Sequence, residues 1–256
     1  MPSPLNGKVI VVTGASSGIG AAIAQRVTRD GATAILVARR SKALQEVVDR
    51  CKQGKAGRAI AVTADVTSRG EVRRVVAESV AKEDRIDVWI NNVGQGITRV
   101  PSELTDADID DMIRVNVKTA LYGMQEVLPV FRRQRAGHII NISSQLGRAP
   151  TVLPRSAYSA AKHFLNALTE NFRMELAETM PGVTVSLVSP GVVRTDFGLN
   201  ASHGGVDSRA IPGGQDPEEV AEVVAGVIVS LRPDVYTRPG AKASIDRYYA
   251  GLGADP

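Results

Sequence analysis

The sequence contains few residues that could form cross-links or metal centres. Cys51 is its one cysteine, which excludes an intramolecular disulfide framework and a thiolate metal cluster. The three histidines, His138, His163 and His203, are far apart and share no ligand spacing, so we expect no metal site. The first residues show no basic segment followed by an apolar one, as a secretory signal would. These absences predict a cytoplasmic protein without a bound metal.

Long apolar runs and aromatic residues are also scarce. No apolar run approaches the ~18–20 residues that a membrane span requires, so we expect no membrane partner. Lys and Arg number 31 against 27 Asp and Glu, and the sequence pI is about 9.3. The basic residues are nevertheless scattered, and aromatics make up only 4%. Nucleic-acid-binding proteins usually gather basic charge on one face and add aromatic stacking groups, so we expect no nucleic-acid partner.

Short β-branched runs alternate with longer helical patterns along the whole chain. The runs predict strands at 8–13, 33–38, 58–63, 86–91, 138–143 and 183–188, with a short seventh strand at 234–237. Helical patterns cover 18–30, 41–51, 68–82, 106–133, 157–177 and 217–231. Ser41 and Ser68 are expected to cap two of these helices, with Glu71 completing a capping box, and Pro129 is expected to bend or end the fourth.

The strands read as continuous apolar segments, as strands buried on both faces do. Repeated strand–helix–strand units imply a parallel sheet with helices on both faces. We therefore predict an α/β fold, a doubly wound Rossmann sheet of six to seven strands. A (β/α)8 barrel has a similar rhythm and length, but too few strands are present for one. No linker divides the chain, which indicates a single domain over 1–256.

A glycine-rich turn follows the first predicted strand directly. In the segment Thr13-Gly-Ala-Ser-Ser-Gly-Ile-Gly20, Gly14 can adopt backbone angles closed to other residues, and Gly18 lets the backbone approach a phosphate. Gly20 lets the next helix pack closely on the sheet, and the N-terminus of that helix offers N–H groups to a pyrophosphate. The spacing T-G-x3-G-x-G differs from G-x-G-x-x-G, which argues against a methyltransferase.

The second predicted strand ends without an acidic residue. Many dinucleotide folds place a carboxylate there to bind the adenosine ribose, but this chain has Ala38 followed by Arg39 and Arg40. A guanidinium pairs well with a 2′-phosphate. The sequence therefore favours NADP(H) over NAD(H), with NAD(H) still possible. Alternatively, the two arginines are solvated surface charges.

With these motifs, the chain resembles the short-chain dehydrogenase/reductase family, from Lys8 to about Pro239. Asn141-Ile-Ser-Ser144 at a strand end matches the family's catalytic serine motif, and Tyr158-Ser-Ala-Ala-Lys162 matches its Y-x3-K pair. Asn116, within Arg114-Val-Asn-Val117, matches the helix asparagine of the catalytic tetrad. The tetrad predicted from this resemblance is Asn116, Ser144, Tyr158 and Lys162.

The resemblance implies a role for each member of this tetrad. Tyr158 exchanges the proton with the carbonyl or alcohol oxygen, and Ser144 orients that oxygen. Lys162 holds the nicotinamide ribose, and Asn116 supports a water that links Lys162 to solvent. Because Lys162 lies four residues after Tyr158, both side chains share one helix face, and we expect the ammonium to lower the pKa of the phenol.

Further matches to the family predict the rest of the cofactor site. Asn91-Asn92-Val93-Gly94 stands where the family has N-N-A-G, and Val93 in place of alanine predicts a slight rearrangement. Asp65 follows the third strand, where the family's aspartate contacts the adenine. The predicted cofactor-binding residues are Gly14, Ser16, Ser17, Gly18, Ile19, Gly20, Arg39, Arg40, Asp65, Val66, Asn92, Gly94, Tyr158, Lys162, Pro190, Gly191, Val193 and Thr195.

The substrate is a small carbonyl or alcohol compound by the same resemblance, and an NADP(H) preference favours carbonyl reduction. Predicted substrate contacts are Gln95, Gln145, Leu153 and Phe197, with 194–212 as a mobile lid. His203 in this lid is expected to be solvated. The lid has no charge cluster that would select a phosphate or carboxylate, so a neutral, partly apolar ketone or aldehyde is favoured.

Two further questions stay open on the sequence alone. The chain could be a catalytically silent NADP-binding sensor on the same fold, although such proteins often lose the Tyr or the Lys. Relatives commonly form dimers or tetramers through the two long helices, here 106–134 and 157–177, so we expect a homodimer or homotetramer. The role of the tail beyond Ser244 is undetermined.

Overall fold

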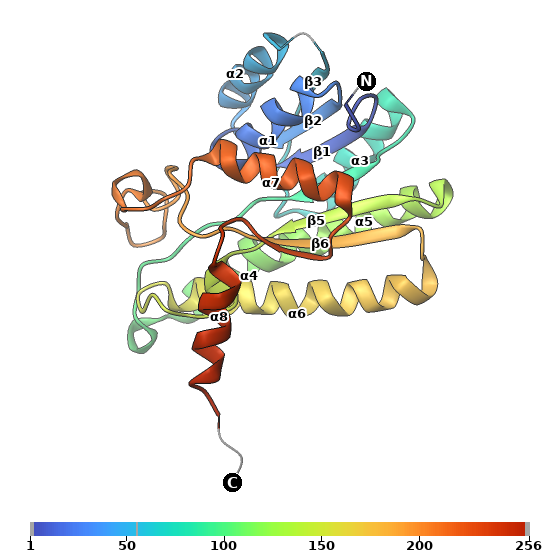
Figure 1. Ribbon diagram of the computed structural model, residues 1–256. Helices are drawn as coiled ribbons and strands as arrows, with labels where there is room; N and C mark the ends of the chain where they lie inside the picture. The colour runs from blue at the N-terminus through green and yellow to red at the C-terminus, as the bar shows by residue number, and fades with distance from the viewer. Residues whose placement is uncertain (1–2, 55, 254–256) are drawn as a thin grey trace.

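Seven parallel strands form one sheet at the centre of the computed structural model, which describes residues 3–54 and 56–253. The strand order in these described residues is β3-β2-β1-β4-β5-β6-β7 (Figure 1). The sheet is open, so the predicted doubly wound fold is confirmed and the barrel alternative is wrong. The strands are β1 (Val9–Thr13), β2 (Thr33–Ala38), β3 (Arg58–Thr63), β4 (Val88–Asn91), β5 (Gly137–Ile142), β6 (Val183–Ser189) and β7 (Asp234–Tyr236).

Helices cover both faces of this sheet. In β1, Ile10 and Val12 pack on the side of α1, α2 and α7, whereas Val9 and Val11 pack on the side of α3, α5 and α6. Successive side chains of a strand point to opposite faces, so both must be apolar in a strand covered twice. The helices are α1 (Gly18–Arg29), α2 (Ser41–Lys52), α3 (Arg69–Glu83), α4 (Asp106–Ile113), α5 (Thr119–Gln134), α6 (Ser156–Thr179), α7 (Pro217–Ser230) and α8 (Ala241–Ala250).

Three local features of the helices differ from what the sequence predicted. The cap position of α2 is Arg40, with Ser41 already in the first turn. Ser68 does hold the cap position of α3, but its side chain makes no capping hydrogen bond, and Glu71 pairs with Arg74 at 2.7 Å instead. Pro129 lies inside α5 and does not end it. The buried apolar face around Pro129 outweighs the backbone hydrogen bond that proline removes.

The tail beyond the last strand forms α8, which extends away from the body of the molecule at its lower edge (Figure 1). Gly240 begins this helix with a positive φ of 76°, a conformation that favours glycine. None of the helices in the described parts of the chain is both long and apolar enough to cross a membrane.

Candidate active site

The loops after β1 to β6 enclose a cavity of about 840 Å³ at the carboxyl ends of the strands. β1 lies between β2 and β4. Strands β2 and β3 continue the sheet on one side of β1, and strands β4 to β7 continue it on the other side. Open α/β sheets bind ligands at this switch point, where the neighbouring loops separate. The cavity is therefore where the fold predicts the site.

The glycine-rich turn forms the floor at one end of the cavity. Gly14 and Gly18 have φ values of 67° and 53°, which few other residues adopt. A Cβ at Gly18 would lie 3.1 Å from the Thr195 side chain. A Cβ at Gly20 would lie 2.4 Å from the Gly14 carbonyl oxygen, so glycine is required for α1 to begin here. The turn leaves the N-terminus of α1 open to a phosphate group.

Two arginines line the same end of the cavity. Arg40 donates hydrogen bonds from Nη2 to the hydroxyls of Ser16 and Ser17, at 3.2 and 3.0 Å. Arg39 is 72% exposed, and its Nη1 lies 4.0 Å from the Asp65 carboxylate. The arginines thus place positive charge beside the glycine turn, where the sequence predicted a phosphate-binding group.

Asn92 ties the end of β4 to β1. Its backbone N–H donates to Thr13 Oγ1 at 3.0 Å, and its Nδ2 donates to the Thr13 carbonyl, also at 3.0 Å. Val93 follows and lines the cavity, and its Cγ2 would lie 3.2 Å from a Cβ at Gly14. The valine therefore fits beside the turn because residue 14 is a glycine.

Asn116 lies in a π-helical turn, Arg114–Lys118, which separates α4 from α5. The sequence pattern predicted one uninterrupted helix here. Asn116 donates from Nδ2 to the Gln95 carbonyl at 3.0 Å and accepts from the Gln95 N–H at 3.1 Å. It is buried behind Gly94, where a Cβ would lie 3.1 Å from Asn116 Oδ1 and 3.5 Å from Lys162 Nζ. Asn116 therefore lies close to Lys162 without lining the cavity.

Ser143 and Ser144 have different environments at the end of β5. Ser143 is buried and donates to Asn166 Oδ1 at 2.5 Å. Ser144 accepts a hydrogen bond from the Leu146 N–H at 3.1 Å and lines the cavity. Because the Ser143 hydroxyl already donates to Asn166, Ser144 is the better candidate for contact with a ligand.

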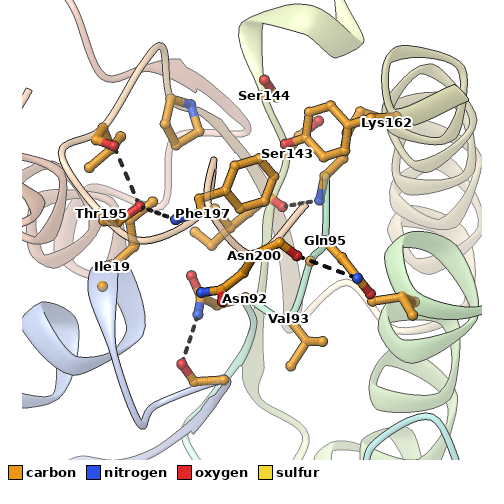
Figure 2. Close-up of a pocket in the computed structure, with 18 of the residues that line it drawn as sticks. Ile19, Asn92, Val93, Gln95, Ser143, Ser144, Lys162, Thr195, Phe197 and Asn200 are labelled. Carbon is orange, nitrogen blue, oxygen red and sulfur yellow. Dashed lines mark hydrogen bonds between the residues drawn. The ribbon is translucent and has the colours of Figure 1, made fainter. Parts of the chain in front are cut away.

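Tyr158 and Lys162 lie on the cavity-facing side of α6, one turn apart. Lys162 Nζ is 5.8 Å from the centre of the Tyr158 ring and donates to the Ile142 carbonyl at 3.0 Å. In Figure 2, Ser143, Ser144 and Lys162 lie on one side of the cavity and Ile19, Asn92 and Thr195 on the other, with Phe197 between. The candidate catalytic residues thus lie across the cavity from the glycine turn.

Burial raises the pKa of Tyr158 to about 12, although Ser144 and the Arg155 guanidinium act in the opposite direction. Burial also lowers the pKa of Lys162 to about 8. The expectation that Lys162 lowers the pKa of Tyr158 is wrong for this structure. The ammonium is directed to the Ile142 carbonyl, and loss of solvation of the phenolate dominates.

The segment after β6 supplies the other wall. Pro190, Gly191, Val193 and Thr195 line the cavity, as the sequence predicted. Thr195 Oγ1 accepts from the Phe197 N–H at 3.3 Å, and the Phe197 ring centre is 5.4 Å from that of Tyr158.

The loop that follows is held against the segment after β4. Ser202 donates from its N–H to the Gly96 carbonyl at 2.9 Å and accepts from the Thr98 N–H at 3.0 Å. His203 Nε2 lies 2.6 Å from Asp108 Oδ1, at the start of α4. His203 is exposed, as expected for a solvated loop histidine, but it also contacts Asp108 because the fold brings α4 beside this loop.

Most of the predicted ligand contacts line the cavity, but not all. Gln95, Gln145 and Phe197 line it, whereas Leu153 is 66% exposed and lies outside it. Gly20 acts in packing and does not line the cavity. The sequence did not lead us to predict that α8 lines the cavity. The sequence feature that could have indicated it is the apolar spacing of Ala241, Ile245 and Tyr248. Cavity-lining residues outside the predicted contacts and the predicted lid include Arg114, Arg155, Ser244, Ile245 and Tyr248.

A doubly wound sheet with a glycine turn at its switch point and a Ser–Tyr–Lys group across the cavity defines a dinucleotide-binding oxidoreductase. The family model for short chain dehydrogenases matches residues 8–204. The chain belongs to this family, the short-chain dehydrogenases/reductases, and is an NAD(P)-dependent oxidoreductase.

Known relatives and solved structures agree with this assignment. An uncharacterized oxidoreductase of Staphylococcus aureus is 36% identical over 223 residues, which span 86% of this chain and 90% of the relative. An alcohol dehydrogenase from Thermococcus sibiricus, solved with 5-hydroxy-NADP, has a TM-score of 0.78 and 26% identity, covering 90% of this chain and 96% of that one. A short-chain dehydrogenase/reductase from Burkholderia phymatum, solved with NAD, has a TM-score of 0.87 and 24% identity, with 98% of each chain covered. This last likeness concerns the fold.

Proposed function

We propose that the protein reduces a ketone or aldehyde to an alcohol with NADP(H), or catalyses the reverse reaction, with Tyr158 as general acid or base. The observation that carries this proposal is the placement of Ser144, Tyr158 and Lys162 around one cavity that also contains the glycine turn. In the balanced reaction, a carbonyl compound, NADPH and a proton give an alcohol and NADP⁺. The bound nicotinamide supplies the hydride that forms the new C–H bond.

The chain's own residues handle the oxygen and its proton. The Tyr158 hydroxyl donates the proton that forms the O–H bond as the carbonyl π bond breaks, and solvent then returns a proton to Tyr158. The high pKa of Tyr158 keeps it protonated at neutral pH, which favours its role as the acid in reduction. Ser144 orients the carbonyl oxygen, Lys162 binds the ribose hydroxyls, and Asn116 supports a water that links Lys162 to solvent.

Arg39 and Arg40 support a preference for NADP(H). Both line the cavity beside Ser16 and Ser17, and no acidic residue ends β2. The 2′-phosphate of NADP(H) would pair with the guanidinium groups of these two arginines. The Arg40 guanidinium already points toward the glycine turn, since it donates to the Ser17 hydroxyl. Asp65 and Val66 would contact the adenine, and the segment from Pro190 to Thr195 would hold the nicotinamide.

Fluorescence titration with NADPH and NADH tests this proposal most directly. Wild-type protein should bind NADPH more tightly, and Arg39→Ala and Arg40→Ala should each weaken NADPH binding selectively. Arg132→Ala, at an exposed position of α5, is a control that removes the same charge elsewhere. Equal or tighter binding of NADH by the wild type would contradict the arginine argument.

Turnover of a panel of ketones and aldehydes then tests the chemistry. NADPH oxidation by wild-type protein but not by Tyr158→Phe would support catalysis by Tyr158. Cofactor binding with no turnover of any carbonyl or alcohol would instead favour the silent sensor.

We also propose that the chain acts as one domain, that 194–212 closes over the substrate, and that the protein is cytoplasmic.

We further propose that the protein forms a homodimer or homotetramer. The exposed apolar side chains of α6 support this assembly, since Phe164 and Met174 are 52% and 61% exposed. Size-exclusion chromatography with light scattering tests this assembly, and a monomeric mass at micromolar concentration would contradict it.

A further inference from the structure

The C-terminal helix α8 lines the same cavity as Tyr158. Ser244, Ile245 and Tyr248 of α8 line it, although they are far in sequence from every catalytic residue. Ala241, Ile245 and Tyr248 recur at four and three residues, so they share one helix face. Ala241 is buried and the other two are half-buried, whereas the remaining α8 residues are exposed. The helix therefore turns its apolar face toward the cavity.

Specific contacts hold α8 in this position. The Tyr249 hydroxyl donates to the Arg148 carbonyl at 2.6 Å. Arg148 in turn pairs with Asp234, and its guanidinium lies 5.9 Å from the centre of the Tyr236 ring. Arg148 follows Ser144 by four residues, so α8 is tied both to the loop of the catalytic serine and to β7. A helix anchored at this point can form a defined wall.

Other segments of the chain also contribute apolar side chains to the cavity. Phe197 packs against Tyr158, and Leu146 and Ile211 line the cavity from two further segments. Together with Ile245 and Tyr248, these side chains give the cavity that contains Tyr158 several apolar lining groups. Such groups gain free energy by burying apolar surface of a ligand.

The two charged groups on the substrate side already have contacts. Asp196 lies 3.1 Å from Arg209 across the lid. Arg155 donates from Nη1 to the Ile97 carbonyl at 3.2 Å, and a Cβ at Gly96 would lie 2.6 Å from that nitrogen. Arg155 is therefore packed against the backbone of residues 96 and 97, which favours a structural role over binding of an anionic substrate.

We infer that α8 is a substrate-selecting wall, and that the substrate is a bulky, uncharged carbonyl compound whose rings lie against Ile245 and Tyr248. This inference rests on the proposed carbonyl reduction and deepens it. An aromatic or alicyclic ring next to the carbonyl fits because Phe197 and Tyr248 offer ring surfaces, and aromatic pairs add to the gain from buried area.

A graded series of neutral methyl ketones tests the inference. We would compare acetone, acetophenone and 2-acetylnaphthalene with wild-type protein, Ile245→Ala and Tyr248→Ala. In the wild type, kcat/KM should rise by about tenfold or more with each added ring, since each ring buries several apolar carbons. Tyr248→Ala should lose most of the gain for the bicyclic ketone and lower kcat/KM for acetone far less. Lys242→Ala, on the exposed side of α8 and paired with Asp246, is the matched control.

Three outcomes would overturn the inference. One is a wild-type kcat/KM that does not depend on ring number, and another is an equal loss for all three ketones in Tyr248→Ala. The third is a preference for a carboxylate-bearing ketone that disappears in Arg155→Gln, which would indicate an anionic substrate. Calorimetric binding of 2-acetylnaphthalene to protein saturated with NADPH separates this inference from the proposed function. Binding weakened by Tyr248→Ala without any turnover would support the wall and contradict the reductase.

Discussion

The Asp108 carboxylate and His203 Nε2 lie 2.6 Å apart and join the start of α4 to the loop between β6 and α7. Asp108 also accepts from Arg99 Nη1 at 3.0 Å and from the Thr105 N–H at 3.0 Å. These donors, His203 first, hold the pKa of the Asp108 carboxyl well below its usual range. The carboxylate therefore stays ionised across the physiological pH range and can hold the loop of residues 194–212, our proposed lid, in its present position.

Loss of this contact should loosen the lid. We expect His203→Ala to raise the KM for the carbonyl substrate about twofold to tenfold, the range that one net hydrogen bond supplies, with a smaller change in kcat. Steady-state kinetics at saturating NADPH measures both constants. Leu199→Ala, an exposed lid position outside the cavity, is the control. An unchanged KM in His203→Ala would show that the contact does not influence substrate binding.

Removal of the Tyr158 hydroxyl should abolish proton transfer and leave the cofactor site intact. General acid–base groups contribute about 10²–10⁴ in rate, so Tyr158→Phe should lower kcat by at least the lower of these factors. The Kd for NADPH should change little, because the phenyl ring keeps its packing against Phe197. A variant with near-normal kcat would mean that another group supplies the proton.

Activity should fall at alkaline pH because of Lys162. Burial lowers its pKa to about 8, below its usual value of about 10.4, so the ammonium is lost as pH rises through about 8. Tyr158, with a pKa near 12, cannot account for a fall in this range. A pH profile of kcat/KM for carbonyl reduction measures the effect. The guanidinium of Lys162→Arg keeps its charge, so the residual activity of this variant should not fall near pH 8. A fall at the same pH in Lys162→Arg would mean that a group other than Lys162 titrates there.

Stability should fall on acidification because of His138. Its Nε2 lies 2.8 Å from Ser186 Oγ, while its Nδ1 is buried without a partner in the described residues. Burial lowers its pKa to about 4, from 6.5, so the unfolded chain binds a proton that the folded state rejects. Stability is therefore lost as pH falls from about 6.5 toward 4, by about 3 kcal/mol at most.

Urea unfolding at pH 7 and pH 4.5 measures this loss. His138→Gln should show a smaller fall in unfolding free energy between the two pH values than the wild type. His163→Gln removes a different histidine and should behave like the wild type. Equal acid sensitivity in all three proteins would show that carboxylates, not His138, control the acid transition.

The sequence by itself determined the features that depend on local spacing. Continuous apolar runs such as that of β1 are buried on both faces because every second side chain points the same way, so they predicted the parallel sheet. The Gly14–Gly18–Gly20 turn and the Tyr158–Lys162 pair were likewise visible, since each lies within one turn or one helix. The effect of Pro129 was not visible in this way, since α5 continues through it to Gln134.

Only the tertiary structure decided which distant segments meet. No sequence pattern links His203 to Asp108 or Tyr249 to Arg148, because these contacts follow from how the loops and α8 fold over the sheet. The pKa values of Tyr158 and Lys162 also could not be predicted from the sequence. Helix spacing predicts that the two side chains are neighbours, but the direction of each shift depends on burial, which removes both charged forms from water.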